Sequence, residues 1–483
     1  MKISLIHQDR ESLQKSIILM KKTKKTLCLI TLTILALFSN QNMTAQIDPN
    51  FMNLLLEKKI ITQREVDSIN TLSIFNQKIN TENKNFSVGL EFRPRLEYRD
   101  GYKQLRTSDT QAAYFGTHRS RLYFSYSQPK FKFHTSIQDI RVWGQYGQTS
   151  TTGSFNVFEA YAETALSDNL SVRLGRQKVE LDNGRIFSAA NWSQAARAHD
   201  GVNFIYDNGR IHSEFISSFN QTAERIFETD FAPTTFTNYK WLNVHYLKAK
   251  LNDHFTLTTI NAADGYQSKT NARTLYTRGT SGGRLDYERG NLYLTMSGYY
   301  QYGQLQDGNR ISAYYFQPEI QLKTGKLTSR LGAEFMSGDN ADKPSEISKS
   351  FVPLYGVAWK FMGNMDYFTV FPTDVKKGGL FNPYLFFIYD VTKKLALRSD
   401  FHLFYLGNKL KDNLNNDVNS YLGFENDLSI HYKCNPFTML DFGFSYMAAE
   451  KSMETLKTGN SNIIPVWSYF MITLKPELFN FKK

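Results

Sequence analysis

The sequence predicts an all-β protein, a transmembrane antiparallel β-barrel of about 18 strands that follows a short helical segment on the periplasmic side. Two observations carry this prediction. From residue 86 onward, runs of alternating apolar and polar residues follow one another, and this period of two is typical of β-strands. The breaks between the runs are alternately short and long, as in outer-membrane barrels, which have short periplasmic turns and long external loops.

The opening strand, residues 86–99, has one apolar face and one charged face. Its even positions are all apolar, and its other face carries five charges, those of Glu91, Arg93, Arg95, Glu97 and Arg99. A soluble sheet would pack the apolar face on a core, whereas a barrel would turn it to lipid and the charges to a wet lumen. The runs at 329–335, 394–405 and 422–432 repeat the pattern. This favours a water-filled interior, because an Arg or Lys facing lipid costs about 2–4 kcal/mol.

The breaks between the runs predict the arrangement of the strands. Short breaks such as 207–210 and 323–326 contain the Asn, Asp or Gly residues that tight hairpins require. Long breaks lie between the short ones, and the two longest are 178–199 and 337–378. An even number of strands places both chain termini of the barrel on the short-turn side and lets every backbone group pair.

The first 45 residues predict a cleaved signal peptide, so we expect export to the bacterial outer membrane. A basic stretch at 21–25 precedes the apolar run 27–38, and Ala45 supplies a small residue at the cleavage position. Met20 stands directly before the lysines and is a candidate start, which would make residues 1–19 an upstream artefact. The alternative is a membrane anchor, but the apolar run is shorter than the roughly 20 residues that a transmembrane helix needs.

Residues 46–85 differ in kind from the barrel, which we expect to occupy residues 86–483. The stretch 51–59 is typical of a short helix, and 62–65 has the spacing of a capping box that opens a second helix. Residues 76–85 are polar, as linkers are. This segment is either a plug or assembly element that binds a periplasmic partner, or a simple cap before the barrel.

The composition of the 483-residue chain fits a barrel and excludes several other classes. Phe and Tyr, 37 and 28 in number, suit strands and the aromatic girdles at the two membrane interfaces. A mean hydropathy of −0.42 argues against a helical membrane protein. Of the net charge of +12, residues 1–45 supply +5, and the remaining +7 contains no basic tract suited to nucleic acid. Outer-membrane lipid is the expected surrounding.

The same residues give little support for catalysis or for a cofactor. Only Cys434 remains once residues 1–45 are removed, so no disulfide or cysteine-based metal site is expected. The nine His residues form no HExxH motif, and no GxSxG nucleophile elbow is present. We therefore expect a protein that is not an enzyme and that uses no metal or cofactor. A structural or adhesive barrel and a barrel-embedded hydrolase remain as alternatives.

Charged residues are densest in the first strands, and these are the candidate lining of a solute pathway. Arginine clusters with interleaved carboxylates bind carboxylates and phosphates, and a ring of them at a constriction selects anions. The alternative is that they form cross-strand ion pairs that brace the wall. The candidate positions are Glu91, Arg93, Arg95, Glu97, Arg99, Arg119, Arg121, Asp139, Arg141, Glu159, Arg173 and Arg176.

Residues 86–206 also resemble a known family. The succession RPRLEYRDGY, THRSRLYF, IQDIRVWGQ and LGRQKVELDNGRIFSAANWSQAARAHDG is similar to the alginate-export family of outer-membrane barrels. The resemblance implies an 18-stranded barrel with an arginine-rich, electropositive constriction that passes a polyuronate. It implies that the twelve charged positions line that constriction, and it makes the loops 178–199 and 337–378 candidates for folding inward.

Residue pattern and resemblance together give the expected function. We expect an outer-membrane channel that passes anionic solutes by passive diffusion through an arginine-lined lumen. A polyuronate such as alginate, or a related anionic saccharide, is the first expectation for the solute. The alternative is a general porin or one selective for phosphate or carboxylate.

Overall fold

The computed structural model describes residues 84–482, except residues 151, 222, 228–238, 269–270 and 272. These residues belong to one compact unit, Thr81–Lys483. The signal peptide predicted for residues 1–45 lies outside the described residues. The predicted helical segment over 46–85 also lies outside them, apart from its last two residues.

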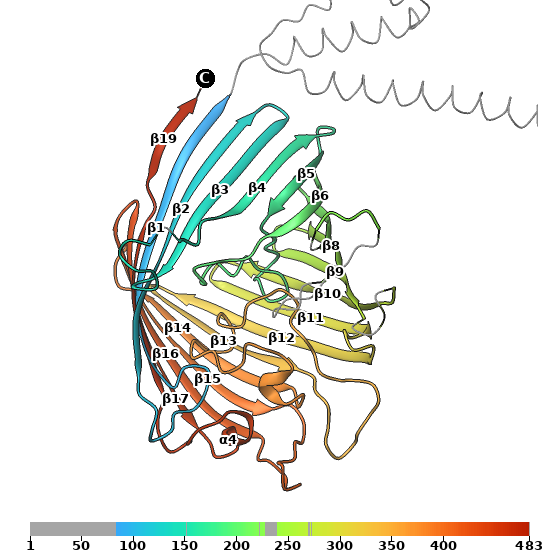
Figure 1. Cartoon of the computed structure of the whole chain (residues 1–483), viewed down its shortest axis with the longest axis vertical. Coiled ribbons are helices and arrows are strands. Elements are labelled where there is room, and N and C mark those ends of the chain that lie inside the picture. Colours follow the sequence, from blue (N-terminus) through green and yellow to red (C-terminus); the bar gives the residue numbers. More distant parts are fainter. Residues whose placement is uncertain are drawn as a thin grey trace, which may run out of the picture. The chain divides into compact units, whose positions relative to one another are not determined.

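The described chain forms a closed antiparallel barrel (Figure 1). The first half of the wall consists of β1 (Asn85–Asp100), β2 (Ala113–Gln128), β3 (Phe131–Val142), β4 (Asn156–Ala165), β5 (Leu170–Gln177), β6 (His199–Asp207), β7 (Ile211–Phe219), β8 (Trp241–Lys250) and β9 (Phe255–Gln267). The second half consists of β10 (Leu275–Arg289), β11 (Leu292–Gln304), β12 (Arg310–Thr324), β13 (Leu327–Met336), β14 (Leu380–Asp390), β15 (Leu395–Leu406), β16 (Tyr421–Asn435), β17 (Thr438–Ala449), β18 (Val466–Leu474) and β19 (Glu477–Lys482). Each strand from β1 to β17 pairs with the next along the chain.

The last two segments, β18 and β19, act as one strand of the wall. Both pair with β1, and this pairing closes the barrel. They are separated at Lys475–Pro476, where proline has no N–H to donate to the ladder. The carbonyl of Pro476 still accepts a hydrogen bond from the Leu90 N–H at 3.1 Å. The barrel therefore has 18 wall strands, the even number that the sequence predicts.

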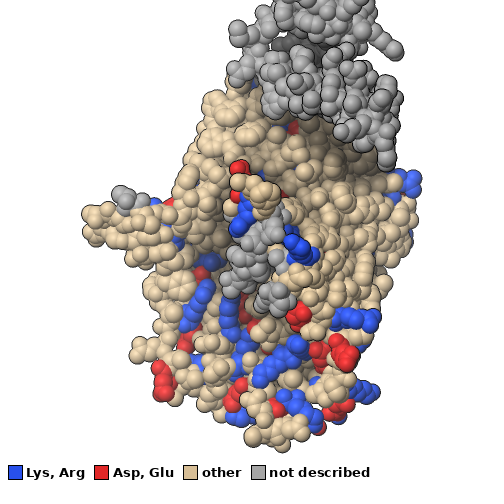
Figure 2. All heavy atoms as spheres, turned by 45° about the vertical axis from the view of Figure 1, so that its right-hand side comes forward, with Lys and Arg blue, Asp and Glu red and all other residues tan. Residues whose placement is uncertain are grey.

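The two faces of the wall separate by residue type. On β1 the odd positions Glu91, Arg93, Arg95 and Glu97 are buried inside, while Phe86 and Tyr98 on the other face are exposed. Many large apolar side chains elsewhere also remain exposed, as a surface that meets lipid requires. Figure 2 shows mostly uncharged surface over the upper part of this view, with Lys, Arg, Asp and Glu gathered toward its lower end.

Short and long connections alternate along the whole chain. Asn85 pairs with Lys482 and with Ser127 beside the β2–β3 turn. The start of the first strand and the end of the last strand therefore both lie on the short-turn side of the barrel. The long connections lie at the opposite end, and they include the short helix α4 (Met453–Leu456). No helix among the described residues is long and apolar enough to cross a membrane.

Two of the long connections fold into the barrel, as the family resemblance implies. They are residues 178–198, between β5 and β6, and residues 337–379, between β13 and β14, which contain the 3-10 helix η1 (Thr373–Val375). The two loops pair through a parallel bridge between Phe187 and Tyr355. The Ser188 N–H donates to the Tyr355 carbonyl at 3.0 Å. Gly356 permits this contact, because a Cβ there would lie 1.9 Å from the Arg185 carbonyl oxygen.

The apolar core lies inside the barrel, where these loops pack against inward side chains of the wall. Phe368 of the second loop packs on Phe404 of β15 with ring centroids 4.7 Å apart. Phe351 of the same loop stacks on Tyr315 of β12 at 5.5 Å. The lumen is therefore narrowed by two loops that are fixed to the wall.

Candidate lumen constriction

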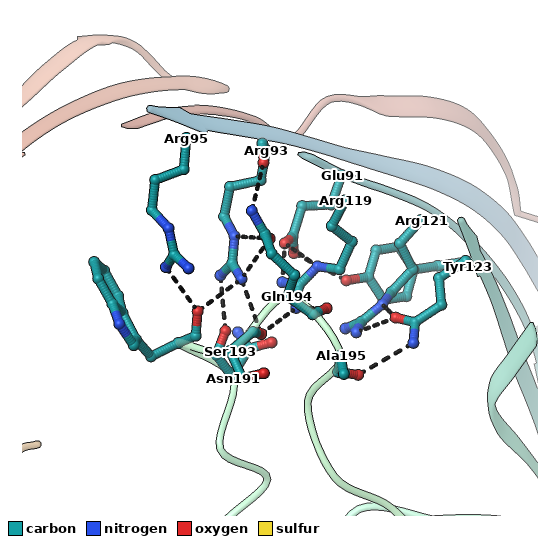
Figure 3. A network of polar contacts seen from close by, with 12 residues as sticks. Glu91, Arg93, Arg95, Arg119, Arg121, Tyr123, Asn191, Ser193, Gln194 and Ala195 are labelled. Atoms are coloured by element: carbon teal, nitrogen blue, oxygen red, sulfur yellow. Dashed lines mark hydrogen bonds and ion pairs between the residues drawn. The ribbon is translucent and has the colours of Figure 1, made fainter. Parts of the chain in front are cut away.

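The first half of the constriction is an arginine cluster on β1 and β2, formed by Arg93, Arg95, Arg119 and Arg121 (Figure 3). Arg93 and Arg119 lie directly opposite each other, and Glu91 lies opposite Arg121. All four side chains point inward and are buried, and Arg119 is 0% exposed. Like charges in this position are destabilising unless other groups compensate them. The compensating groups come from the first inward loop and from the wall itself.

The tip of that loop, residues 191–195, lies across the guanidinium groups. Arg93 donates from Nη1 to the Asn191 carbonyl at 2.7 Å. Arg119 donates from Nη1 to the Gln194 carbonyl at 3.1 Å. The Gln194 side chain accepts from Arg93 Nε at 3.2 Å and returns a bond from Nε2 to the Arg93 carbonyl at 3.3 Å. Main-chain carbonyls of the loop tip thus accept hydrogen bonds from the guanidinium groups of the cluster.

The wall supplies further acceptors and counter-charges to the cluster. Arg119 forms an ion pair with Glu91, and Arg95 Nε lies 2.9 Å from Glu97 Oε1. Arg121 donates from Nε to Gln138 Oε1 at 2.9 Å. In this cluster four guanidinium groups therefore face two carboxylates, and amide and carbonyl oxygens meet the excess positive charge.

The structure divides the twelve predicted pathway residues by face. Nine of them point into the barrel, namely Glu91, Arg93, Arg95, Glu97, Arg99, Arg119, Arg121, Glu159 and Arg173. Seven of these nine are buried, whereas Arg99 and Arg173 keep 32% and 25% of their side chains exposed. Whether a solute meets any of the nine stays a prediction.

The other three predicted residues, Asp139, Arg141 and Arg176, point outward, and this corrects the expectation that they line the lumen. Asp139 pairs with Ser120 and Arg141 with His118, on the outer face of β2. The β2–β3 hairpin sets this register by placing Gln138, not Asp139, opposite Arg121.

Arg176 faces outward for a simpler reason. It follows the inward Arg173 by three residues, an odd spacing that reverses the face of a strand. Its guanidinium pairs with the exposed Asp200 at 2.7 Å.

The second half of the constriction is a cavity of about 390 Å³ between the two loops and the opposite wall. The wall contributes Arg330 from β13, Arg398 from β15 and His431 from β16. The loops contribute Trp192, Trp359 and Lys360, and β18 adds Trp467 and Tyr469. The polar residues on the three wall runs follow the alternation visible in the sequence, although they were not among the predicted site residues. The loop residues had no such signal, because loops carry no period.

Carboxylates of the wall hold the second loop in place. Glu425 accepts the Met365 N–H at 2.7 Å, and Asp427 accepts the Asn364 N–H at 3.1 Å. A Cβ on Gly363 would lie 2.3 Å from Glu425 Oε1, so the backbone approaches the carboxylate closely here. These contacts define one wall of the cavity.

The first loop is also anchored on the side away from the arginine cluster. Asp182 accepts hydrogen bonds from Tyr246 and Thr258, each at 2.9 Å. Burial raises the pKa of the Asp182 carboxyl, and the two hydrogen bonds oppose that shift. Among the described residues, no group of three or more His, Cys, Asp and Glu side chains could hold a metal ion.

Comparisons with known proteins identify a family match and similar solved structures. The alginate export family matches residues 84–449. The structure of OccAB1 from Acinetobacter baumannii is similar with a TM-score of 0.56 and 12% identity, over 82% of this chain and 97% of that one. The outer membrane protein OpdK from Pseudomonas aeruginosa gives a TM-score of 0.55 and 10% identity, over 82% and 99%. None of the curated proteins matches.

The family match covers more than half of the chain and spans most of the barrel. The structural similarities, at identities of 10–12%, agree with it on the fold alone. The protein is therefore an outer-membrane channel, not an enzyme, and it belongs to the alginate export family.

Proposed function

We propose that this outer-membrane channel lets anionic saccharides, such as the polyuronate alginate, cross by passive diffusion. The observation that carries the proposal is the presence of Arg330 and Arg398 in the 390 Å³ cavity. Their side chains keep 21% and 30% of their surface exposed. Lys360 of the second loop adds a third cation, with 36% of its side chain exposed.

These three cations suit a carboxylate that moves past them. Guanidinium groups bind carboxylates with paired N–H donors, and Arg330 already does so with Glu319, at 3.0 and 2.8 Å. In a narrow lumen, charges are screened less than on an open surface, where the Debye length is about 8 Å at physiological salt. A polyuronate carries a carboxylate on every sugar, so consecutive sugars could exchange between neighbouring cations.

Carboxylates in the same cavity keep the binding weak. Asp400 pairs with Arg398 at 2.6 Å, and Asp427 accepts a hydrogen bond from the Asn364 N–H of the second loop. Conduction needs solute binding that is favourable but short-lived, and such competing anions provide this. We infer that the arginine cluster on β1 and β2 acts differently, by holding residues 191–195 across the lumen and so fixing its width.

A porin for small phosphates or carboxylates is the second candidate. The same exposed guanidinium groups favour it, because they bind any such anion. The two candidates differ in the size of the solute that occupies the cavity. Current block in planar bilayers separates them, since a uronate oligomer and a monomeric carboxylate at equal charge concentration can be compared directly.

The test combines this measurement with two variants. Arg330→Gln with Arg398→Gln should weaken block by a uronate oligomer on the order of tenfold, the scale of a lost charge-assisted contact. Arg176→Gln is the matched control, because that arginine also pairs with an aspartate but points outward. Heat-modifiable migration of each variant checks that the barrel has formed. If the folded double variant is blocked as strongly as the wild type, the proposed site is wrong.

A further inference from the structure

The cavity has an aromatic side that the charges do not explain. Trp192 comes from the first inward loop and Trp359 from the second, and their ring centroids lie 5.9 Å apart with an interplanar angle of 42°. Tyr469 of β18 meets Trp192 edge-on at 4.9 Å. Three sections of chain, distant in sequence, thus bring aromatic rings to one side of the cavity.

We propose that Trp359, supported by Trp192, forms a stacking subsite for the sugar rings of the solute. This inference rests on the proposed function and extends it, because it makes the ring of the solute, and not only its charge, a feature that the channel recognises. A pyranose ring presents a flat face of C–H groups that packs on an aromatic face, much as other apolar groups do. A phosphate or a small carboxylate has no such face.

The two tryptophans differ from the rings that only fill space. Trp467, which also borders the cavity, is 2% exposed and donates from Nε1 to Glu97 Oε2 at 3.0 Å, as a structural residue does. Trp192 and Trp359 are only half-buried. Each ring has a cation near one face, with Arg95 at 4.7 Å from the Trp192 centroid and Lys360 Nζ at 5.5 Å from the Trp359 centroid. Trp192 also packs against Trp467 and Tyr469, which leaves its ring less free than that of Trp359. Trp359 is therefore the principal platform.

The polar side of the cavity points to the same class of solute. Arg330 is paired with Glu319, Arg398 with Asp400, and His431 with Asp441 at 2.5 Å. These pairs leave the guanidinium groups partly exposed, so they still attract an anion. Paired charges also offer donors and acceptors side by side, which is what a row of sugar hydroxyl groups requires.

The size of the cavity agrees with this assignment. Its volume of about 390 Å³ lies in the usual range for small-ligand sites, about 300–1,000 Å³. Such sites combine apolar and aromatic surface with a few polar groups that orient the ligand. The cavity therefore holds part of a saccharide chain at a time, with one ring against Trp359.

The test uses single-channel block by two oligomers of equal length, one of neutral glucose units and one of uronate units. Trp359→Ala should weaken block by both oligomers on the order of tenfold, and Trp359→Phe should restore most of it, because Phe keeps an aromatic face. The ratio of anion to cation permeability should not change in either variant. Trp143→Ala is the matched control, since Trp143 is exposed at the end of β3 and is hydrogen-bonded to His118 on the outer face.

Two results would overturn the inference, and they are distinct from failure of the proposed function. If Trp359→Ala folds normally and block by both oligomers is unchanged, the subsite does not exist. If only block by the uronate oligomer falls, Trp359 acts by placing the neighbouring Lys360, and ring stacking is wrong. A wild-type channel that is not anion-selective, but whose block by the neutral oligomer depends on Trp359, would instead refute the anionic part of the proposed function.

Discussion

Arg185 in the first inward loop and Glu334 on β13 form an ion pair inside the barrel, with Arg185 Nε 2.7 Å from Glu334 Oε1 and side-chain exposures of 2% and 0%. Arg185 also donates from Nη1 to the Val357 carbonyl of the second loop at 2.9 Å. One side chain therefore ties both loops to the wall. Breaking a buried pair by removing one partner costs about 3–5 kcal/mol, because the other charge is left without compensation.

We expect Glu334→Gln to loosen both loops. The substitution keeps the shape of the side chain but leaves Arg185 buried without its counter-charge, so the loops should leave the lumen more often. Single-channel conductance should rise, and current fluctuations should increase. The matched control is Asp200→Asn, which breaks an exposed pair with Arg176 that contributes at most about 1 kcal/mol. Equal conductance in the two folded variants would show that the ion pair does not hold the loops.

A second prediction concerns the arginine cluster and the register of β3. Arg93→Ala removes the hydrogen bonds to the tip at residues 191–195 and should widen the lumen, which polymer exclusion in planar bilayers measures. Arg141→Ala should leave the lumen unchanged, because Arg141 faces outward beside His118. A wider lumen in the Arg141 variant, with no change in the Arg93 variant, would mean that the register is wrong.

The face assignment of β1 makes a third prediction. Leu90→Arg places a charge on the outer face, at a cost of about 2–4 kcal/mol if the site lies near mid-membrane, so barrel assembly should fall. Ser87→Arg places the same charge on the inner face and should be tolerated. Heat-modifiable migration of membrane fractions reports the folded share of each variant. Equal folding of the two variants would contradict the assignment.

The orientation of the barrel makes a fourth prediction, tested in a background with Cys28→Ser and Cys434→Ser, which removes both cysteines of the chain. A cysteine at Asn413, in the long connection between β15 and β16, should react with an impermeant reagent in intact cells. A cysteine at Lys326, in the short β12–β13 turn, should stay silent until the outer membrane is opened. The reverse labelling pattern would place the long connections in the periplasm.

The fold was predictable from the sequence because its determinants are local. The alternation of residues 86–99 identifies a strand without reference to any partner. Turn residues, such as those at 207–210, mark the hairpins. Repeating these two signals along the chain is sufficient for the number of strands and for the positions of the long connections.

The site was predictable only in part, because register and loop contacts are not local. A shift of one residue reverses a face, and this is why Asp139 and Arg141 face outward. The hydrogen bonds from Arg93 to the loop tip join residues about 100 positions apart, and no pattern in the sequence predicts such contacts. Trp359 lies in a connection without periodicity, so its place in the cavity emerges only from the folded chain.

The central claim is that the lumen favours anions, and the zero-current potential of the wild-type channel under a salt gradient in planar bilayers tests it most directly. We expect a potential whose sign reports anion selectivity, and we expect it to move toward zero in the folded Arg330→Gln, Arg398→Gln double variant and to stay unchanged in Arg176→Gln. A wild-type potential of zero, or one of the sign that reports cation selectivity, would contradict the account.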